Sequence, residues 1–371
     1  MSSLSRETSN VLVTEADKSA RAISELRRGA PIILMSGQSA LLVAAAEMIE
    51  PLRLQALRSI AKSPGHLAIT AARATTLKAR AYDGDLARIK LRAEQGAPAL
   101  RALADPALDL ANPLLGPHET ERGGEVALHR AALKLCKLAL LLPAAATWPL
   151  PSRATATALA QSLELTSLEP LALEKDASWR QVVAASLPIE VAEKARLHVF
   201  RRGPWEDEHY ALEIGEPDRS EPVLTRLHSA CVTGDLFGSL KCDCGPQLQA
   251  AMAAIGAAGA GVLVYLLQEG RGIGLANKLR AYRLQDQGFD TVEANHRLGF
   301  EDDERLLRDG GDILKALGFQ RARVMTNNPN KLAALQEAGV QVVERVPLII
   351  PSNPKNEAYL QVKARKSGHL L

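Results

Sequence analysis

The stretch RLHSACVTGDLFGSLKCDCGPQL, residues 226–248, decides how this chain is organised. It holds three of the four cysteines in the sequence: Cys231, Cys242 and Cys244. Thiolates at this spacing suit zinc, and three protein ligands leave a fourth coordination position open for water, which is typical of a catalytic metal. The same spacing also fits a structural zinc completed by a neighbour such as His228, or reduced cysteines that only pack.

Polar and basic side chains surround these cysteines, and a purely structural zinc loop has no need of them. A second motif, QEGRGIG at 268–274, follows the apolar run 262–267, which is typical of a buried strand, and precedes a helix expected over 276–288. A strand, a glycine turn and a helix place backbone N–H groups where they can hold phosphate oxygens. A glycine turn also occurs merely to let two backbones pass.

These segments together carry a family resemblance. RLHSACVTGD at 226–235, KCDCG at 241–245 and QEGRGIG at 268–274 resemble GTP cyclohydrolase II of riboflavin biosynthesis, and the match extends from about residue 195 to the C-terminus. The resemblance implies one Zn²⁺ per chain, held by the three cysteines, which lowers the pKa of bound water to about 7. It implies GTP as substrate, opening of the guanine imidazole ring, release of formate and pyrophosphate, and Mg²⁺ with the triphosphate.

The resemblance also implies a set of residues that contact GTP. They are Arg226, Leu227, His228, Ser229, Ala230, Gln247, Glu269, Gly270, Arg271, Thr291, Thr326 and Lys331. Arginine and lysine suit phosphate by charge and geometry, whereas Gln, Glu and Thr suit the edges of the base or ribose. Thr291 and Thr326 also suit plain helix caps, and Lys331 also suits a solvated first turn.

The segment EDDER, residues 301–305, resembles the family's catalytic segment, which implies Asp303 as general base and Arg305 as nucleophile at the α-phosphate. A guanidinium stays protonated at ordinary pH, so charge stabilisation is the plainer chemistry for Arg305. Side chains two residues apart reach one site from an extended segment or a helix start, which predicts a non-helical segment. Tyr282 matches the family's catalytic tyrosine, with Lys278 one turn earlier on the same helix face; a buried, hydrogen-bonded tyrosine is the alternative.

The sequence departs from the family pattern at two places. Ala230 stands where a glutamate is frequent in the family. After Arg305, Leu306-Leu307 and Gly310-Gly311 replace a more usual acidic-aromatic pair and a smoother helix. These departures motivate two alternatives: a paralogue in another pathway, such as pyrimidine catabolism, or a non-catalytic nucleotide-binding regulator. The three cysteines, the glycine turn and Asp303 argue against the regulator.

Length and composition restrict the class of protein. The 371 residues suffice for two domains of ordinary size. A net charge of +3 and 4% aromatic residues indicate no nucleic-acid partner. The longest apolar stretch, 138–150, is too short for a membrane span, and the N-terminus lacks a signal peptide pattern. With clustered thiols that need a reducing compartment, we expect a cytoplasmic protein without a membrane partner, and a homodimer.

The N-terminal half carries a fainter resemblance. Residues 22–34, AISELRRGAPIIL, look like the first helix and strand of 3,4-dihydroxy-2-butanone 4-phosphate synthase. That family continues into an acidic loop that binds magnesium, whereas SGQSA at 36–40 contains no carboxylate. The sequence therefore predicts an α+β (mixed α/β) chain of two domains: a synthase-like but inactive α/β domain over 1–185, and a GTP cyclohydrolase II domain over 186–371.

Periodicity predicts the individual elements. In the N-terminal half these are a helix over 17–28, a strand over 31–35, an alanine-rich helix near 42–60, a strand over 67–70, long loops over 81–125 and an apolar helix over 127–142. In the C-terminal half they are strands over 210–214, 223–227 and 322–325, a helix after Pro246, and a helix beginning near Asn330. The lone Cys136 is interpreted as core filler.

Overall fold

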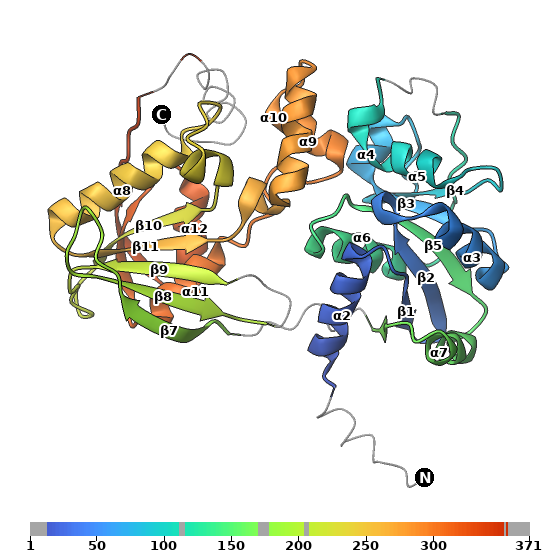
Figure 1. Ribbon diagram of the computed structural model, residues 1–371, viewed down its shortest axis with the longest axis horizontal. Helices are drawn as coiled ribbons and strands as arrows, with labels where there is room; N and C mark the ends of the chain where they lie inside the picture. The colour runs from blue at the N-terminus through green and yellow to red at the C-terminus, as the bar shows by residue number, and fades with distance from the viewer. Residues whose placement is uncertain (1–12, 111–115, 170–177, 204–207, 352–353, 355–371) are drawn as a thin grey trace, which may run out of the picture. The chain divides into compact units, whose positions relative to one another are not determined.

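The chain forms two compact units (Figure 1). The computed structural model describes residues 13–110, 116–169, 178–203, 208–351 and 354. Unit 1 comprises Met1–Asp176 and Ala276–Glu301, and unit 2 comprises Ala177–Leu275 and Asp302–Leu371. A helical segment from the second half of the sequence therefore belongs to the first unit.

Unit 1 is built on a six-stranded sheet in the order β4-β3-β5-β2-β1-β6. Its strands are β1 (Ile32–Ser36), β2 (Ser39–Ala45), β3 (His66–Thr70), β4 (Leu86–Lys90), β5 (Ala144–Leu150) and β6 (Ser167–Leu168). Its N-terminal helices are α2 (Glu15–Arg27), α3 (Pro51–Ala61), α4 (Ala71–Thr76), α5 (Ala97–Ala104), α6 (Ala127–Leu138) and α7 (Arg153–Ser162), with short 3-10 turns η1 (Ala46–Met48) and η2 (Pro106–Leu108). The sheet is mixed, because β1 pairs antiparallel with β2 and parallel with β6.

The prediction of an alanine-rich helix near 42–60 is wrong in its first part, which forms strand β2. Leu42 of this strand lies opposite Ile33 of β1 on one side and opposite Trp148 of β5 on the other. Leu42 is fully buried, and this tertiary pairing outweighs the helix propensity of the alanines. Helix α3 begins only at Pro51, whose fixed φ suits the first helical position.

The stretch 81–125, predicted as long loops, also contains regular structure. Strand β4 pairs antiparallel with β3, and helix α5 follows it. Leu86 and Ile89 of β4 are buried. The charged and glycine residues around them gave the stretch no clear strand pattern in the sequence. The predictions for α2, β1, β3 and α6 are confirmed, and Cys136 of α6 is fully buried, as expected of core filler.

Unit 2 is built on a seven-stranded sheet in the order β13-β12-β10-β11-β9-β8-β7. Its strands are β7 (Arg180–Ser186), β8 (Ala195–Arg201), β9 (His209–Ile214), β10 (Val223–Ser229), β11 (Gly261–Leu266), β12 (Arg321–Met325) and β13 (Gln341–Val346). Its helices are α8 (Cys244–Ala258), α11 (Arg308–Ala316) and α12 (Pro329–Glu337), with the short turns η4 (Val232–Leu236) and η5 (Glu269–Gly272). The two mixed sheets confirm the predicted fold class.

Strand β10 lies between β11 and β12 and runs parallel to both. The carboxyl ends of these strands therefore meet at one edge of the sheet, which is where open α/β sheets bind ligands. Three loops leave this edge: 230–243 after β10, 267–273 after β11 and 326–328 after β12. They contain Cys231, Cys242 and most of the glycine turn.

The core of unit 2 lies on both faces of this sheet. Val262 and Val264 of β11 pack in one apolar cluster with Ile313 of α11. Leu263, between them in the sequence, packs in another with Ile255 of α8. Because neighbouring side chains of a strand point to opposite faces, α8 and α11 cover opposite sides of the sheet.

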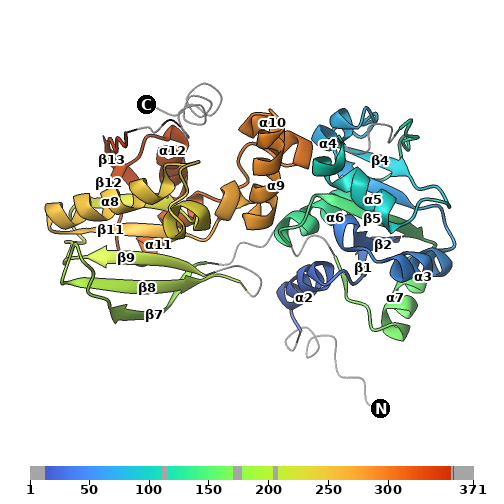
Figure 2. The same cartoon turned by 45° about the horizontal axis from the view of Figure 1, so that its top comes forward.

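The remaining helices, α9 (Gly274–Asp286) and α10 (Thr291–Leu298), follow the glycine turn in the sequence. From Ala276 to Glu301 this segment belongs to unit 1, and α10 packs beside α4 (Figures 1 and 2). Asp290 caps α10 through a capping box with Glu293. Within the described residues, no helix combines the length and apolar character that a membrane crossing requires.

Candidate active site

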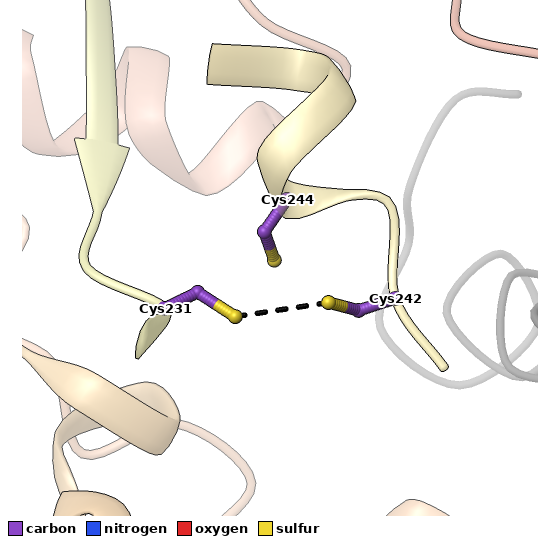
Figure 3. A group of neighbouring side chains, drawn as sticks. All are labelled: Cys231, Cys242 and Cys244. Atoms are coloured by element: carbon purple, nitrogen blue, oxygen red, sulfur yellow. Dashed lines mark hydrogen bonds between the residues drawn. The ribbon is translucent and has the colours of Figure 1, made fainter. Parts of the chain in front are cut away.

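The three cysteines of the opening stretch converge at the end of β10. Their sulfur atoms lie within 4.8 Å of one another, and the Sγ atoms of Cys231 and Cys242 are 3.7 Å apart (Figure 3). Two thiolates on a tetrahedral zinc ion lie about 3.8 Å apart, given Zn–S bonds of about 2.3 Å. The donor atoms and their spacing therefore fit zinc. Cys231 and Cys242 are buried, and Cys244, the first residue of α8, is partly exposed.

Two glycines allow the cysteine loops to approach so closely. A Cβ atom on Gly234 would lie 2.9 Å from the Cys242 sulfur, and one on Gly245 would lie 2.3 Å from the Gly234 carbonyl oxygen. The Gly234 N–H also donates to the Cys231 sulfur at 3.3 Å. A side chain at Gly234 or Gly245 would therefore clash with the neighbouring loop, and the Gly234 N–H helps to orient the Cys231 sulfur.

His228 does not complete the cluster. Its Nε2 atom lies 3.1 Å from both carboxylate oxygens of Asp235. Asp235 also accepts hydrogen bonds from the Tyr265 hydroxyl at 2.8 Å and the Cys231 N–H at 3.0 Å. Among the residues that the structure describes, no histidine, carboxylate or further cysteine joins the three sulfurs as a close group. The alternative of a structural zinc closed by His228 is therefore not supported.

The glycine turn contacts the cysteine loop and the EDDER segment. The Glu269 carboxylate accepts from the Val232 N–H at 2.6 Å. Arg271 lies in the left-handed region with φ 62°, its side chain donates to the Asp302 carbonyl at 3.1 Å, and its own carbonyl accepts from the Glu304 N–H at 3.0 Å. A Cβ on Gly272 would lie 2.8 Å from the Glu304 backbone. The turn thus brings residues 302–304 to the cysteine loop.

Asp303 and Arg305 form a bidentate ion pair, with N–O distances of 2.8 and 2.6 Å. Arg305 also donates to the Ser229 hydroxyl at 3.2 Å, next to the cysteine loop. The segment is not helical, as predicted, and α11 begins only at Arg308. Burial acts to raise the pKa of the Asp303 carboxyl, but the hydrogen bonds and charge of Arg305 outweigh it and the pKa is lowered.

The pH dependence of stability checks this ion pair. Because the folded-state pKa of Asp303 is lowered, the pair stabilises the protein above the ordinary carboxyl pKa of about 3.9, and this contribution is lost as the pH falls through the lowered value. The wild type should therefore be more stable than Asp303→Asn at pH 7, and the difference should shrink in acid. Urea unfolding at the two pH values measures it, and a constant difference would exclude the pair as its source.

Arg226 and Lys331, two of the residues expected to contact GTP, lie at the same edge. Arg226 donates to the Met325 carbonyl at 2.9 Å and to the Gln247 side chain. Lys331 is buried, and its ammonium donates to the Leu227 carbonyl at 2.6 Å, so the solvated alternative for Lys331 is wrong. Burial lowers the pKa of Arg226 to about 10, which still leaves the guanidinium charged at neutral pH.

The other expected contacts differ in what they offer. Leu227 is a core residue and presents only its backbone. Ala230 is buried and donates its N–H to the Leu266 carbonyl. The Thr326 hydroxyl accepts from the Asn328 N–H at 3.0 Å, while Asn328 rather than Thr326 caps α12.

Tyr282 and Thr291 lie on α9 and α10, in unit 1. The Lys278 ammonium is 5.8 Å from the centroid of the Tyr282 ring, so the two side chains share a helix face as predicted. The Thr291 hydroxyl accepts from the Gln285 side chain at 3.2 Å. Asp290 provides the cap of α10, so the alternative of Thr291 as a cap is wrong.

Sequence reasoning missed a buried network around Asp309. Its carboxylate accepts from Arg202 at 2.7 Å and from the Gln268 side chain at 3.2 Å. Gln268 also donates to the Leu306 carbonyl at 3.2 Å. Asp309 therefore ties the glycine turn to the chain that follows Arg305. The signal in the sequence was an aspartate on the apolar face of a helix, but Arg202 lies 107 residues away.

Substitution Asp309→Asn should lower the free energy of unfolding by about 2 kcal/mol, because the Arg202 side chain, which is only 12% exposed, loses its charged partner. Asp312→Asn is the matched control on the same helix, since its contacts to Arg308 and Lys315 are partly exposed and worth less than about 1 kcal/mol. Urea unfolding of both variants measures the difference. Equal midpoints would show that the Asp309 network does not stabilise the fold.

Comparison with known proteins agrees with this geometry. The family model for GTP cyclohydrolase II matches residues 180–347. Along nearly its whole length the chain is 42% identical to GTP cyclohydrolase-2 from Azospirillum brasilense, covering 95% of this chain and 93% of that protein. The chain belongs to the GTP cyclohydrolase II family.

Over a shorter stretch, the chain is more similar to other relatives than it is to this one over its whole length. It is 59% identical over 164 residues to GTP cyclohydrolase-2 from Cronobacter sakazakii, covering 44% of this chain and 83% of that protein. It is 60% identical over 164 residues to riboflavin biosynthesis protein RibBA from Bacillus cereus, covering only 41% of that protein.

A weaker likeness covers the N-terminal half as well. A two-domain 3,4-dihydroxy-2-butanone 4-phosphate synthase from A. baumannii is 18% identical, covers 88% of this chain and 99% of that chain, and has a TM-score of 0.33. A likeness of that size does not identify the fold of unit 1, which is known here from its own strands and helices.

Proposed function

We propose that this family member hydrolyses GTP to formate, pyrophosphate and a ribosylated diaminopyrimidine phosphate, as a step of riboflavin biosynthesis. One observation carries the proposal. A cysteine cluster that fits zinc, a glycine turn and the Asp303–Arg305 pair meet at one edge of the unit 2 sheet. Their joint presence favours catalysis over a purely structural metal or a regulator.

The cysteine cluster would serve the purine base. A zinc ion bound by Cys231, Cys242 and Cys244 would activate water at neutral pH. Asp303, whose pKa is lowered, is a carboxylate at neutral pH, and this is the form that a general base needs. Arg305 holds that carboxylate in place and carries a charge that can stabilise the α-phosphate.

The remaining groups would hold the nucleotide. Arg226 and Lys331 supply positive charge, and the backbone of the glycine turn supplies N–H donors for phosphate oxygens. Gln247 and Thr326 suit polar edges of the base or ribose, and Tyr282 and Thr291 complete the set implied by the family. Mg²⁺ would accompany the triphosphate, because hard cations prefer phosphate and carboxylate oxygens. A reducing compartment such as the cytoplasm suits the three thiols.

The test is to incubate the purified protein with GTP and Mg²⁺ and to measure formate, pyrophosphate and the diaminopyrimidine, together with its zinc content. Equal amounts of the three products are expected. A folded protein that carries zinc and leaves GTP unchanged would instead favour a paralogue with another substrate. Sedimentation of the same sample tests the expected homodimer.

We also propose that unit 1 lacks synthase activity. Ser36 and Ser39 are paired across the tight turn between β1 and β2, which leaves no room for a long acidic loop. Among the described residues, Glu125 is the carboxylate bonded to this turn, at 2.8 Å from the Ser39 hydroxyl. Incubation with ribulose 5-phosphate and Mg²⁺ should give no turnover, and clear turnover would contradict this expectation.

A further inference from the structure

The segment that carries Tyr282 and Thr291 is held by the N-terminal part of unit 1. Asn277 of α9 is fully buried, and its side-chain amide donates to the Leu140 carbonyl at 3.0 Å. The match to the cyclohydrolase II family model includes this segment. Its packing partners, however, come from residues that precede that match.

Arg280 is the charged centre of this attachment. Its guanidinium donates to the Asn277 side-chain oxygen at 2.6 Å and lies 3.4 Å from the carboxylates of Glu47 and Asp105. Glu47 and Asp105 come from two different N-terminal turns, so one arginine connects α9 to two places in the N-terminal part. The side chain of Arg280 is 26% exposed, so the cluster is partly shielded from water.

The C-terminal end of α10 also packs closely against the N-terminal part of unit 1. Gly299 has φ 88°, and a Cβ there would lie 2.8 Å from the Thr70 hydroxyl and 3.0 Å from Pro143. Phe300 is 1% exposed, and the Lys137 ammonium lies 5.8 Å from the centroid of its ring. Helices as short as α9 and α10 are marginal without tertiary packing, so these contacts are what can keep the segment folded.

We propose that the N-terminal part of unit 1 supports the cyclohydrolase reaction by holding α9 and α10 in place, so that Tyr282 and Thr291 are available to it. This inference rests on the proposed function. It gives the N-terminal part of unit 1, for which we propose no synthase activity, a supporting role in the cyclohydrolase reaction. Asn277 and Arg280 are then positioning residues. They act through the helix segment and not on the substrate.

The test uses the full chain with Arg280→Glu, which reverses the charge facing Glu47 and Asp105. Arg280→Lys keeps the charge, and Arg283→Glu makes the same reversal at an exposed position one turn along the same helix. Hydrogen exchange over residues 276–301, zinc content and GTP turnover are measured for each. We expect faster exchange in this segment and at least about tenfold lower kcat for Arg280→Glu, with zinc retained.

Under this inference Arg280→Lys recovers part of both properties, and Arg283→Glu resembles the wild type. Wild-type exchange or wild-type turnover in Arg280→Glu would overturn the inference. If Arg280→Glu fails to fold, Asn277→Ala provides the same comparison with a smaller change. If the wild type itself leaves GTP unchanged, the proposed function fails, whereas the exchange data still decide whether the N-terminal part holds the segment.

Discussion

Cys242→Ser should lose zinc and GTP turnover together. Cys242 is buried with its sulfur 3.7 Å from that of Cys231, so a shorter, harder serine oxygen leaves two soft ligands at the site. We expect zinc content to fall to a small fraction of the wild-type value and kcat to drop by at least about a thousandfold, because metal activation of water contributes several kcal/mol. Metal analysis and formate release measure the two effects on the same sample.

Cys136→Ser is the matched control for this substitution. Cys136 is fully buried in unit 1, and burial raises the pKa of its thiol to about 12, so it stays a neutral thiol. The control should keep its zinc and its turnover and lose only stability, on the order of 1–3 kcal/mol for a buried hydroxyl. Retained turnover in zinc-free Cys242→Ser would contradict a catalytic role for the metal.

Asp303→Asn should lower kcat by about 100- to 10,000-fold, the usual contribution of a positioned general base. The amide has nearly the same size but cannot accept the proton, and it weakens the two contacts to Arg305. Zinc content should remain that of the wild type, since Asp303 is not one of the three metal ligands. Asp302→Asn, at the exposed neighbouring position, is the control and should keep most of the turnover. Equal turnover in the two variants would remove Asp303 from the reaction.

The parts that the sequence predicted correctly are those set by short-range chemistry. Cys242 and Cys244 are almost adjacent and Cys231 is close to them, so their convergence needs only one loop and two glycines. The non-helical form of 301–305 follows from the prediction that Asp303 and Arg305, two residues apart, reach one site. The buried strand 262–267 was visible as a continuous apolar run.

The parts that the sequence did not reveal depend on distant partners. The alanines near residues 42–46 predict a helix, but this stretch forms strand β2. It is a strand because β1 and β5 pair with it on either side and bury Leu42, and the local sequence pattern contains neither of these partners. Asp309 meets Arg202 across 107 residues. Asn277 meets Leu140 across 137 residues, so nothing in the sequence of α9 indicated that it packs in unit 1.

The most direct measurement is the zinc K-edge X-ray absorption spectrum of the purified wild type. We expect three sulfur neighbours at about 2.3 Å and one oxygen neighbour at about 2.0 Å, the coordination of a metal that keeps one position for water. Four protein ligands around the metal, whether a fourth sulfur or an imidazole, would contradict a catalytic zinc at this site.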